Sequence, residues 1–253
     1  PFYATINSIA GLDPVRRKKA TFYDQHSKEK RDMRKVFGII LVLAIGVCGW
    51  LIFYRTPIDT SMGIVQKIMY IHLPFVWTSF LSFLIAFIAS IGYLWKRKEG
   101  FDIIASCTVE IGVVFCGIAL ATGSIWGKPT WNTYWSWDAR VTTTLILFLI
   151  FVGYILLRRF TTYGEQQARL SAVIAIVGFL DIPLIYMSVV WWRTLHQPAT
   201  FFTNKKDVID KPLATMLWIS LAAILFLFAY LLSMRVEIEK KTRAYLKKIA
   251  NIY

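Results

Sequence analysis

Two of the three histidines in this 253-residue chain stand where long apolar segments meet polar sequence. His72 lies in the segment 70–74 (YIHLP), and His196 lies in the segment 191–197 (WWRTLHQ). Imidazole is a common metal ligand, although a single histidine near a membrane surface is more often a tolerated amphipathic side chain. The third histidine, His26, lies in a polar, basic stretch, where we expect it to be solvated.

A tryptophan-rich segment, residues 126–140 (WGKPTWNTYWSWDAR), separates the parts of the chain that carry His72 and His196. It holds four of the ten tryptophans and one tyrosine: Trp126, Trp131, Trp135, Trp137 and Tyr134. An aromatic belt at a bilayer surface needs only about one or two rings per helix end. Four indoles form a wide apolar platform with N–H donors at its rim. This composition predicts a large planar ligand, and a porphyrin whose iron has a histidine on each axial side fits it.

Three charged residues of this segment fit the same ligand. Lys128 and Arg140 can each pair with a propionate, and arginine suits bidentate binding of a carboxylate. Asp138 can orient an indole, a histidine N–H or Arg140. An equally good interpretation is a local salt bridge between Asp138 and Arg140 that shapes the segment, since such pairs are common.

The elements that must position these residues are apolar segments long enough to cross a bilayer. A membrane-spanning helix needs roughly 17–25 residues. Six segments qualify in a chain that is 57% hydrophobic: residues 36–53, 71–95, 103–125, 141–157, 171–192 and 213–234. The sequence therefore predicts an all-α, polytopic membrane protein with six transmembrane helices.

The basic residues predict the orientation. The segments 1–35, 96–102, 158–170 and 235–253 hold 21 of the 29 lysines and arginines, and the other three connections hold 8. Because basic loops stay in the cytoplasm, both termini are expected there, and His72 and His196 are expected at the opposite surface. The net charge of +14 is thereby explained by membrane orientation and contact with anionic lipid, so nucleic-acid binding is not expected.

The chain divides into one membrane domain and two tails. Residues 36–234 form the six-helix domain, residues 1–35 a basic cytoplasmic tail, and residues 235–253 a basic amphipathic tail that would lie on the inner leaflet or bind a partner. The fourth span begins with three threonines, whose hydroxyls can bond back to their own helix or to a neighbouring helix, so we expect this span inside the bundle.

The three cysteines lie in apolar runs and do not form a C-x-x-C or C-x-x-C-H motif. A disulfide framework, a zinc site and covalent attachment of heme to this chain are therefore not expected. Cys48, Cys107 and Cys116 are predicted to be small buried hydrophobic residues.

Two acidic residues fall within the predicted spans, and both should face the bundle or a partner subunit because a carboxylate in lipid is costly. For Asp181 we favour a protonated or hydrogen-bonded structural group, with the carbonyls freed by Pro183 as acceptors. For Glu110 the sequence leaves two interpretations open, a polar path or subunit contact and a structural group.

The pattern W-G-x-x-x-W-x-x-x-W-x-W-D-x-R over residues 126–140, together with the two histidine segments, resembles the heme exporter protein C family of the cytochrome c maturation system. The resemblance runs from about residue 64 to residue 198, and the segment 200–211 matches no pattern of the family. It implies non-covalent heme b with His72 and His196 as axial metal ligands. It also implies that heme contacts Trp126, Trp131, Trp135, Trp137 and Asp138, and Arg140 is predicted to complete the site.

The resemblance further implies a location in the cytoplasmic (inner) membrane, with the heme site on the periplasmic or extracytoplasmic side. The implied partners are a membrane-anchored heme chaperone, the ATPase and permease of an ATP-binding-cassette transporter, and a small single-span membrane subunit. The expected function is heme binding and transfer to the chaperone, which is ligand handling and not enzymatic catalysis. Two alternatives remain: a subunit that transports heme across the membrane, and an electron-transfer b-type cytochrome.

Overall fold

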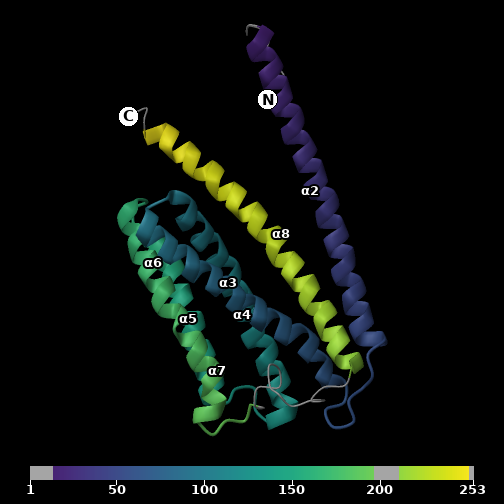
Figure 1. Cartoon of the computed structure of the whole chain (residues 1–253). Helices are drawn as coiled ribbons and strands as arrows, with labels where there is room; N and C mark the ends of the chain where they lie inside the picture. Colours follow the sequence, from purple (N-terminus) through teal and green to yellow (C-terminus); the bar gives the residue numbers. More distant parts are fainter. Residues whose placement is uncertain (1–13, 197–210, 251–253) are drawn as a thin grey trace. The chain divides into compact units, whose positions relative to one another are not determined.

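The computed structural model describes residues 14–196 and 211–250 of the chain, and apart from one isolated β-bridge their regular structure is helical. Figure 1 shows the helices in chain order. They are α2 (Pro14–Tyr54), the short 3₁₀ helix η1 (Ile64–Ile68), α3 (Met69–Lys96), α4 (Glu99–Trp131), α5 (Ala139–Phe160), α6 (Glu165–Phe179), α7 (Asp181–Trp191) and α8 (Lys211–Ala250).

Six helical stretches are long and apolar enough to cross a membrane, which confirms the predicted all-α membrane fold. Their bounds are Arg31–Tyr54, Ile64–Lys96, Glu99–Trp131, Ala139–Phe160, Glu165–Trp191 and Pro212–Ile249. The fifth stretch consists of α6 and α7, which meet at Leu180. Pro183 falls in the first turn of α7, where a proline costs no helical hydrogen bond. The cytoplasmic position of both termini stays a prediction.

The chain separates into two compact units, residues 1–47 and residues 48–253. The second unit contains the helices from α3 to α8 together with the end of α2. Within it, the end of α4 and the end of α7 lie at one end of the bundle, and the connections from α3 to α4 and from α5 to α6 lie at the other (Figure 1).

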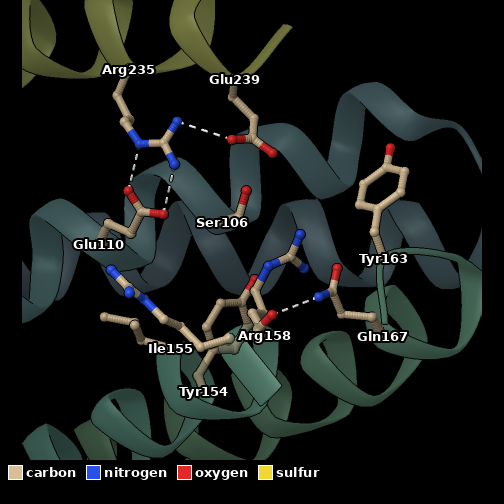
Figure 2. A pocket seen from close by; sticks show the side chains of 10 residues that line it. Ser106, Glu110, Tyr154, Ile155, Arg158, Tyr163, Gln167, Arg235 and Glu239 are labelled. Carbon is tan, nitrogen blue, oxygen red and sulfur yellow. Dashed lines mark hydrogen bonds and ion pairs between the residues drawn. The ribbon is translucent and has the colours of Figure 1, made fainter. Parts of the chain in front are cut away.

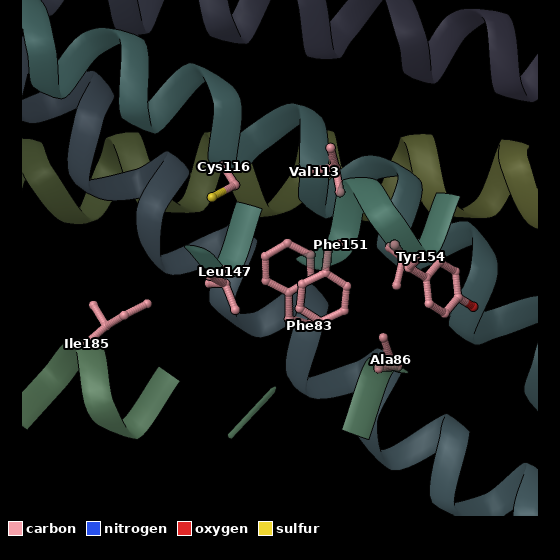
Figure 3. Packing of buried hydrophobic residues seen from close by; sticks show 10 residues of the cluster. Phe83, Ala86, Val113, Cys116, Leu147, Phe151, Tyr154 and Ile185 are labelled. Carbon is pink, nitrogen blue, oxygen red and sulfur yellow. The ribbon is translucent and has the colours of Figure 1, made fainter. Parts of the chain in front are cut away.

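The core of the second unit is built around α4, which is 61% buried in its most apolar window. In this core, Phe83 of α3 and Phe151 of α5 stack with ring centroids 3.9 Å apart (Figure 3). The backbones of α3 and α4 approach closely because the Ser82 hydroxyl donates to the Thr108 carbonyl at 2.5 Å, beside Gly112. A Cβ at residue 112 would lie 2.7 Å from the Ser82 hydroxyl, so this contact requires glycine.

The fourth span does not lie inside the bundle as its threonines suggested. Only 17% of the most apolar window of α5 is buried within the chain. The hydroxyls of Thr143 and Thr144 donate to carbonyls of α5 itself, at Ala139 and Arg140, so they do not join α5 to a neighbouring helix. The helix instead buries one stripe, formed by Leu147, Phe151 and Tyr154.

The cysteines are free and buried, as predicted. The sulfur of Cys48 lies 3.6 Å from the Ser220 hydroxyl, and the side chains of Cys107 and Cys116 are almost fully enclosed in the α4 packing.

A network of ion pairs joins α8 to α4 and α5 at the end of the bundle away from His72. Asp102 of α4 accepts from Arg158 of α5 at 2.7 and 3.0 Å and from Arg243 of α8 at 2.8 Å. Glu110 accepts two hydrogen bonds from Arg235, at 2.6 and 2.9 Å (Figure 2). Glu110 is therefore paired with α8 within this chain, which supports the interpretation of Glu110 as a structural group.

The other intramembrane acid, Asp181, is 8% exposed, and its Oδ2 has no hydrogen-bond partner among the described residues. The hydrogen bond expected from this carboxyl oxygen to a carbonyl freed by Pro183 is therefore not present in the described part of the chain.

The basic segment after Arg235 continues α8 without a break as far as Ala250. Lys247 donates to Glu99 of α4 at 2.5 Å, and Arg243 also pairs with Glu239 one turn earlier in α8. This segment is thus anchored to the bundle by charge. The division of the chain into two tails and a membrane domain remains a prediction.

We expect Asp102→Ala to lower the unfolding free energy in detergent by about 3–5 kcal/mol, because Arg158 loses its carboxylate partner and the buried Arg243 loses one of its carboxylates. The side chains of Asp102 and Arg243 are only 6% and 4% exposed. The matched control is Glu165→Ala, which removes an exposed pair with Arg169 and should cost about 1 kcal/mol or less. Equal losses in the two variants would contradict a stabilising role for the buried network.

Candidate functional site

His72 is held in the first turns of α3 by contacts to α4. Its Nδ1 lies 2.9 Å from the Ala119 carbonyl oxygen and 3.2 Å from the Thr122 hydroxyl. Because a carbonyl oxygen only accepts hydrogen bonds, Nδ1 must carry the proton, and Nε2 is left with a free lone pair. Gly123 makes room for the ring, since a Cβ there would lie 2.9 Å from the His72 Cε1.

His196 follows α7 and is held by the residue that begins α5. Its Nδ1 lies 3.0 Å from the Asp138 Oδ2, and its backbone amide donates to the Thr194 hydroxyl at 3.1 Å. A carboxylate accepts, so Nδ1 carries the proton here as well. Burial lowers the pKa of His196, the hydrogen bond to Asp138 offsets only part of this, and the net pKa lies below the ordinary value. The imidazole is therefore neutral at neutral pH and able to bind a metal through Nε2.

Asp138 joins three parts of the site. It is the N-cap of α5, accepting from the Val141 amide at 3.0 Å, and it also accepts from the Thr194 hydroxyl at 2.9 Å and from His196. Burial raises the pKa of Asp138, but these hydrogen bonds outweigh it, and the net pKa lies below the usual value. Of the partners expected for Asp138, the structure has the histidine N–H. Its carboxylate makes no ion pair with Arg140 in the described part of the chain.

The last turns of α4 connect the two histidines. Trp126 meets His72 edge-on with ring centroids 5.9 Å apart, and Trp131 meets His196 edge-on at 4.6 Å. The sequence predicted a loop over 126–140, but α4 extends to Trp131, so the first two tryptophans are fixed on a helix.

The other aromatic residues of the segment, Tyr134, Trp135 and Trp137, lie in the loop from 132 to 138. Trp135 and Trp137 meet edge-on at 5.8 Å, and Trp137 is 76% exposed, which leaves most of its indole free at the surface. Lys128 donates to the Asn132 carbonyl at 3.1 Å, and its ammonium lies 5.5 Å from the centre of the Tyr134 ring. Lys128 is thus engaged at the end of α4 and is a weaker candidate for a ligand carboxylate.

Several polar atoms between residues 126 and 142 are buried and have no hydrogen-bond partner within residues 14–196 and 211–250. They are the Nε1 atoms of Trp126 and Trp135, the Oγ of Ser136, the Nε of Arg140 and the Oγ1 of Thr142. Each such atom costs about 1–3 kcal/mol when unpaired. A ligand with acceptor oxygens would satisfy them, so this cluster indicates a binding site for a polar group.

Four residues of the site had no signal in the sequence: Thr122, Gly123, Thr194 and Ser136. Small residues of this kind are common in membrane helices and loops, and only their distance from a histidine or an unpaired donor reveals their role. The described residues hold no group of three or more His, Cys, Asp or Glu side chains that could bind a metal ion alone. A metal ion bound by His72 and His196 would need further ligands from outside the protein. A porphyrin provides such ligands to its iron through its ring nitrogens.

Fold and site together define a polytopic membrane protein with a paired-histidine, tryptophan-rich site at one end. The sequence model of the family described as Heme exporter protein C matches residues 20–249. Heme exporter protein C of Bradyrhizobium diazoefficiens is 39% identical over 207 residues, which are 80% of this chain and 76% of the relative. The protein of the same name from Escherichia coli K12 is 35% identical over 200 residues, 78% and 79% of the two chains.

A further relative is named as a mitochondrial protein. The putative cytochrome c biosynthesis ccmC-like mitochondrial protein of Marchantia polymorpha is 36% identical over 151 residues, 60% of this chain and 64% of the relative. With the family match covering most of the sequence, the chain belongs to the heme exporter protein C family.

We expect Asp138→Ala to lower the unfolding free energy by about 1–2 kcal/mol, because α5 loses its N-cap. The variant should also release the His196 ring, which is measurable from the imidazole ¹⁵N shifts of histidine-labelled protein. Asp138→Asn is the matched comparison. The side-chain oxygen of the asparagine can still cap α5, but its NH2 group, in the place of Oδ2, cannot accept a hydrogen bond from His196. A His196 signal that is unchanged in both variants would show that Asp138 does not hold the ring.

Proposed function

We propose that this chain binds heme b non-covalently at the extracytoplasmic membrane surface, with His72 and His196 as axial ligands, and transfers it to a membrane-anchored heme chaperone. Membership of the heme exporter protein C family assigns the chain to heme handling for cytochrome c biogenesis. The axial ligands, the side of the membrane and the chaperone are the proposed details.

One observation carries the proposal. Both imidazoles are held through Nδ1, His72 by the Ala119 carbonyl and His196 by the Asp138 carboxylate, so both Nε2 atoms are left with lone pairs. A histidine metal ligand commonly donates its other ring N–H to a carbonyl or carboxylate, which fixes its orientation and raises its basicity. Two histidines prepared in this way are suited to the two axial positions of one iron.

The tryptophan-rich segment supports the porphyrin part of the ligand. Trp126 and Trp131 stand beside the two histidines, where an aromatic face would pack against a macrocycle. The Nε of Arg140 and the indole N–H groups of Trp126 and Trp135 have no partner in the described part of the chain and are donors for propionate oxygens. The one hydrogen bond that the described residues give Arg140 is long, 3.4 Å to the Tyr186 carbonyl, so its guanidinium is available to a carboxylate.

Transfer to a chaperone is supported by the exposed aromatic surface beside the site. Trp137, Trp191 and Trp192 are 76%, 57% and 53% exposed. Large exposed indoles near a bound ligand suit docking of a second protein. The proposed assembly also contains the ATPase and permease of an ATP-binding-cassette transporter and a small single-span subunit in the cytoplasmic membrane.

The two alternatives have less support. A path for heme across the membrane through this subunit would need free polar groups, but Glu110 is paired with Arg235, and Asp181 stands alone on α7. A transmembrane electron path needs a second heme with its own ligands, and the sequence offers only His26 besides the two site histidines.

We expect the purified protein to show a low-spin heme spectrum, and His72→Ala and His196→Ala each to lose or shift it, because each removes one axial ligand. The measurement is the absorption spectrum of detergent-solubilised protein after reconstitution with heme. His26→Ala is the matched control and should leave the spectrum unchanged. A wild type that takes up no heme, or full and spectrally unchanged loading of both site variants, would contradict the proposal.

We expect Gly123→Ala to weaken heme binding while the protein stays folded, because the new methyl group would lie 2.9 Å from the His72 ring and displace it. Gly153→Ala is the control, since a Cβ there meets no atom within 4 Å. Heme titration of both variants gives the comparison. Equal affinities would show that the position of the His72 ring does not matter for binding.

A further inference from the structure

A polar cavity of about 430 Å³ lies at the end of the bundle opposite the histidines, enclosed by α4, α5, α8 and the start of α6. Figure 2 shows Ser106 and Glu110 of α4, Tyr154 and Arg158 of α5 and Arg235 of α8 around it. The proposed heme site uses none of these residues, so the cavity needs an explanation of its own.

The first observation is a buried hydroxyl. Tyr154 is 1% exposed and lines the cavity, and its hydroxyl interacts with the Arg158 guanidinium, but the hydroxyl proton has no acceptor among the described residues. The Arg158 guanidinium lies 5.8 Å from the centre of its ring. A buried hydroxyl proton without an acceptor is costly, and an acceptor oxygen in the cavity would remove that cost.

The second observation is the charge balance. The cations around the cavity and its adjoining network outnumber the carboxylates by one: Arg158, Arg159, Arg235, Arg243 and Lys247 against Glu99, Asp102, Glu110 and Glu239. Each carboxylate accepts from at least one guanidinium or ammonium group at 3.0 Å or less. Arg159 lines the cavity and makes no ion pair within the described residues. The site therefore has one uncompensated positive charge.

The third observation concerns the surface next to Arg159. Leu156 and Phe160 of α5 are 48% and 85% exposed, and they flank this arginine in the last turns of a membrane-spanning helix. Apolar side chains at this depth face acyl chains, while basic residues at helix ends attract anionic lipid headgroups. A ligand that combines one negative charge with apolar chains fits these surroundings.

We propose that the cavity binds the phosphodiester headgroup of an anionic phospholipid. A phosphodiester carries one negative charge, which matches the single excess positive charge of the cavity. Tyr154 donates to a phosphate oxygen, and Arg159 pairs with the phosphate at the rim. The acyl chains lie along Leu156 and Phe160. This site does not depend on heme, so its test is independent of the heme proposal.

The test is native mass spectrometry of the full chain purified in mild detergent, followed by titration of delipidated protein with phosphatidylglycerol. We expect wild type to retain a phospholipid, and Tyr154→Phe and Arg159→Gln each to weaken its binding by about tenfold, the loss of one charge-assisted hydrogen bond. Tyr245→Phe and Arg55→Gln remove an exposed tyrosine and arginine elsewhere and should bind as wild type does.

Two further binding measurements identify the ligand. Zwitterionic phosphatidylcholine should bind more weakly than phosphatidylglycerol, because its ammonium group cancels the charge that Arg159 recognises. Inorganic phosphate in excess should fail to displace the lipid. Displacement by phosphate would overturn the lipid assignment, and unchanged lipid binding in both cavity variants would overturn the site. Tyr154→Phe removes a single oxygen, and its unfolding temperature shows whether the fold is kept.

Discussion

The hydrogen bonds that hold the two imidazoles by Nδ1 are the interactions on which the rest of the site depends. At His72 the partner is the Ala119 carbonyl of α4, the helix on which α3 packs. At His196 the partner is a carboxylate that also begins α5. These bonds set the tautomer of each ring and leave each Nε2 with its lone pair. Without them a histidine near the membrane surface would rotate freely and bind iron poorly.

Helix α4 connects the two functional ends of the molecule. Its last turns carry Trp126 and Trp131 beside the histidines, and its first turns carry Asp102 and Glu110 within the arginine network. It is also the most buried of the spans. This central helix keeps the proposed heme site separate from the charged end, where α8 is fixed by ion pairs and a lipid phosphate is proposed to bind.

The sequence predicted much of this arrangement and missed the rest for identifiable reasons. Hydropathy was sufficient to predict the six spans, and the tryptophan pattern was sufficient to predict the family. The helical extension of α4 to Trp131 was not predicted, because the apolar run used to define the third span ends at residue 125. The partner of Glu110 lies 125 residues away on α8, a separation that periodicity cannot register. A histidine N–H was one of three partners expected for Asp138, and the structure selects His196, 58 residues away. The threonines of α5 suggested a buried span, but their hydroxyls bond within their own helix.

The most direct test of the account is electron–nuclear double resonance of the ferric heme-loaded protein, prepared with histidine labelled by ¹⁵N either at Nε2 or at Nδ1. The account predicts strong coupling to the iron from two Nε2 nuclei, and only weak coupling from the Nδ1 nuclei that are engaged with Ala119 and Asp138. Strong coupling from an Nδ1 label, or no strongly coupled histidine nitrogen in heme-loaded protein, would contradict the central claim.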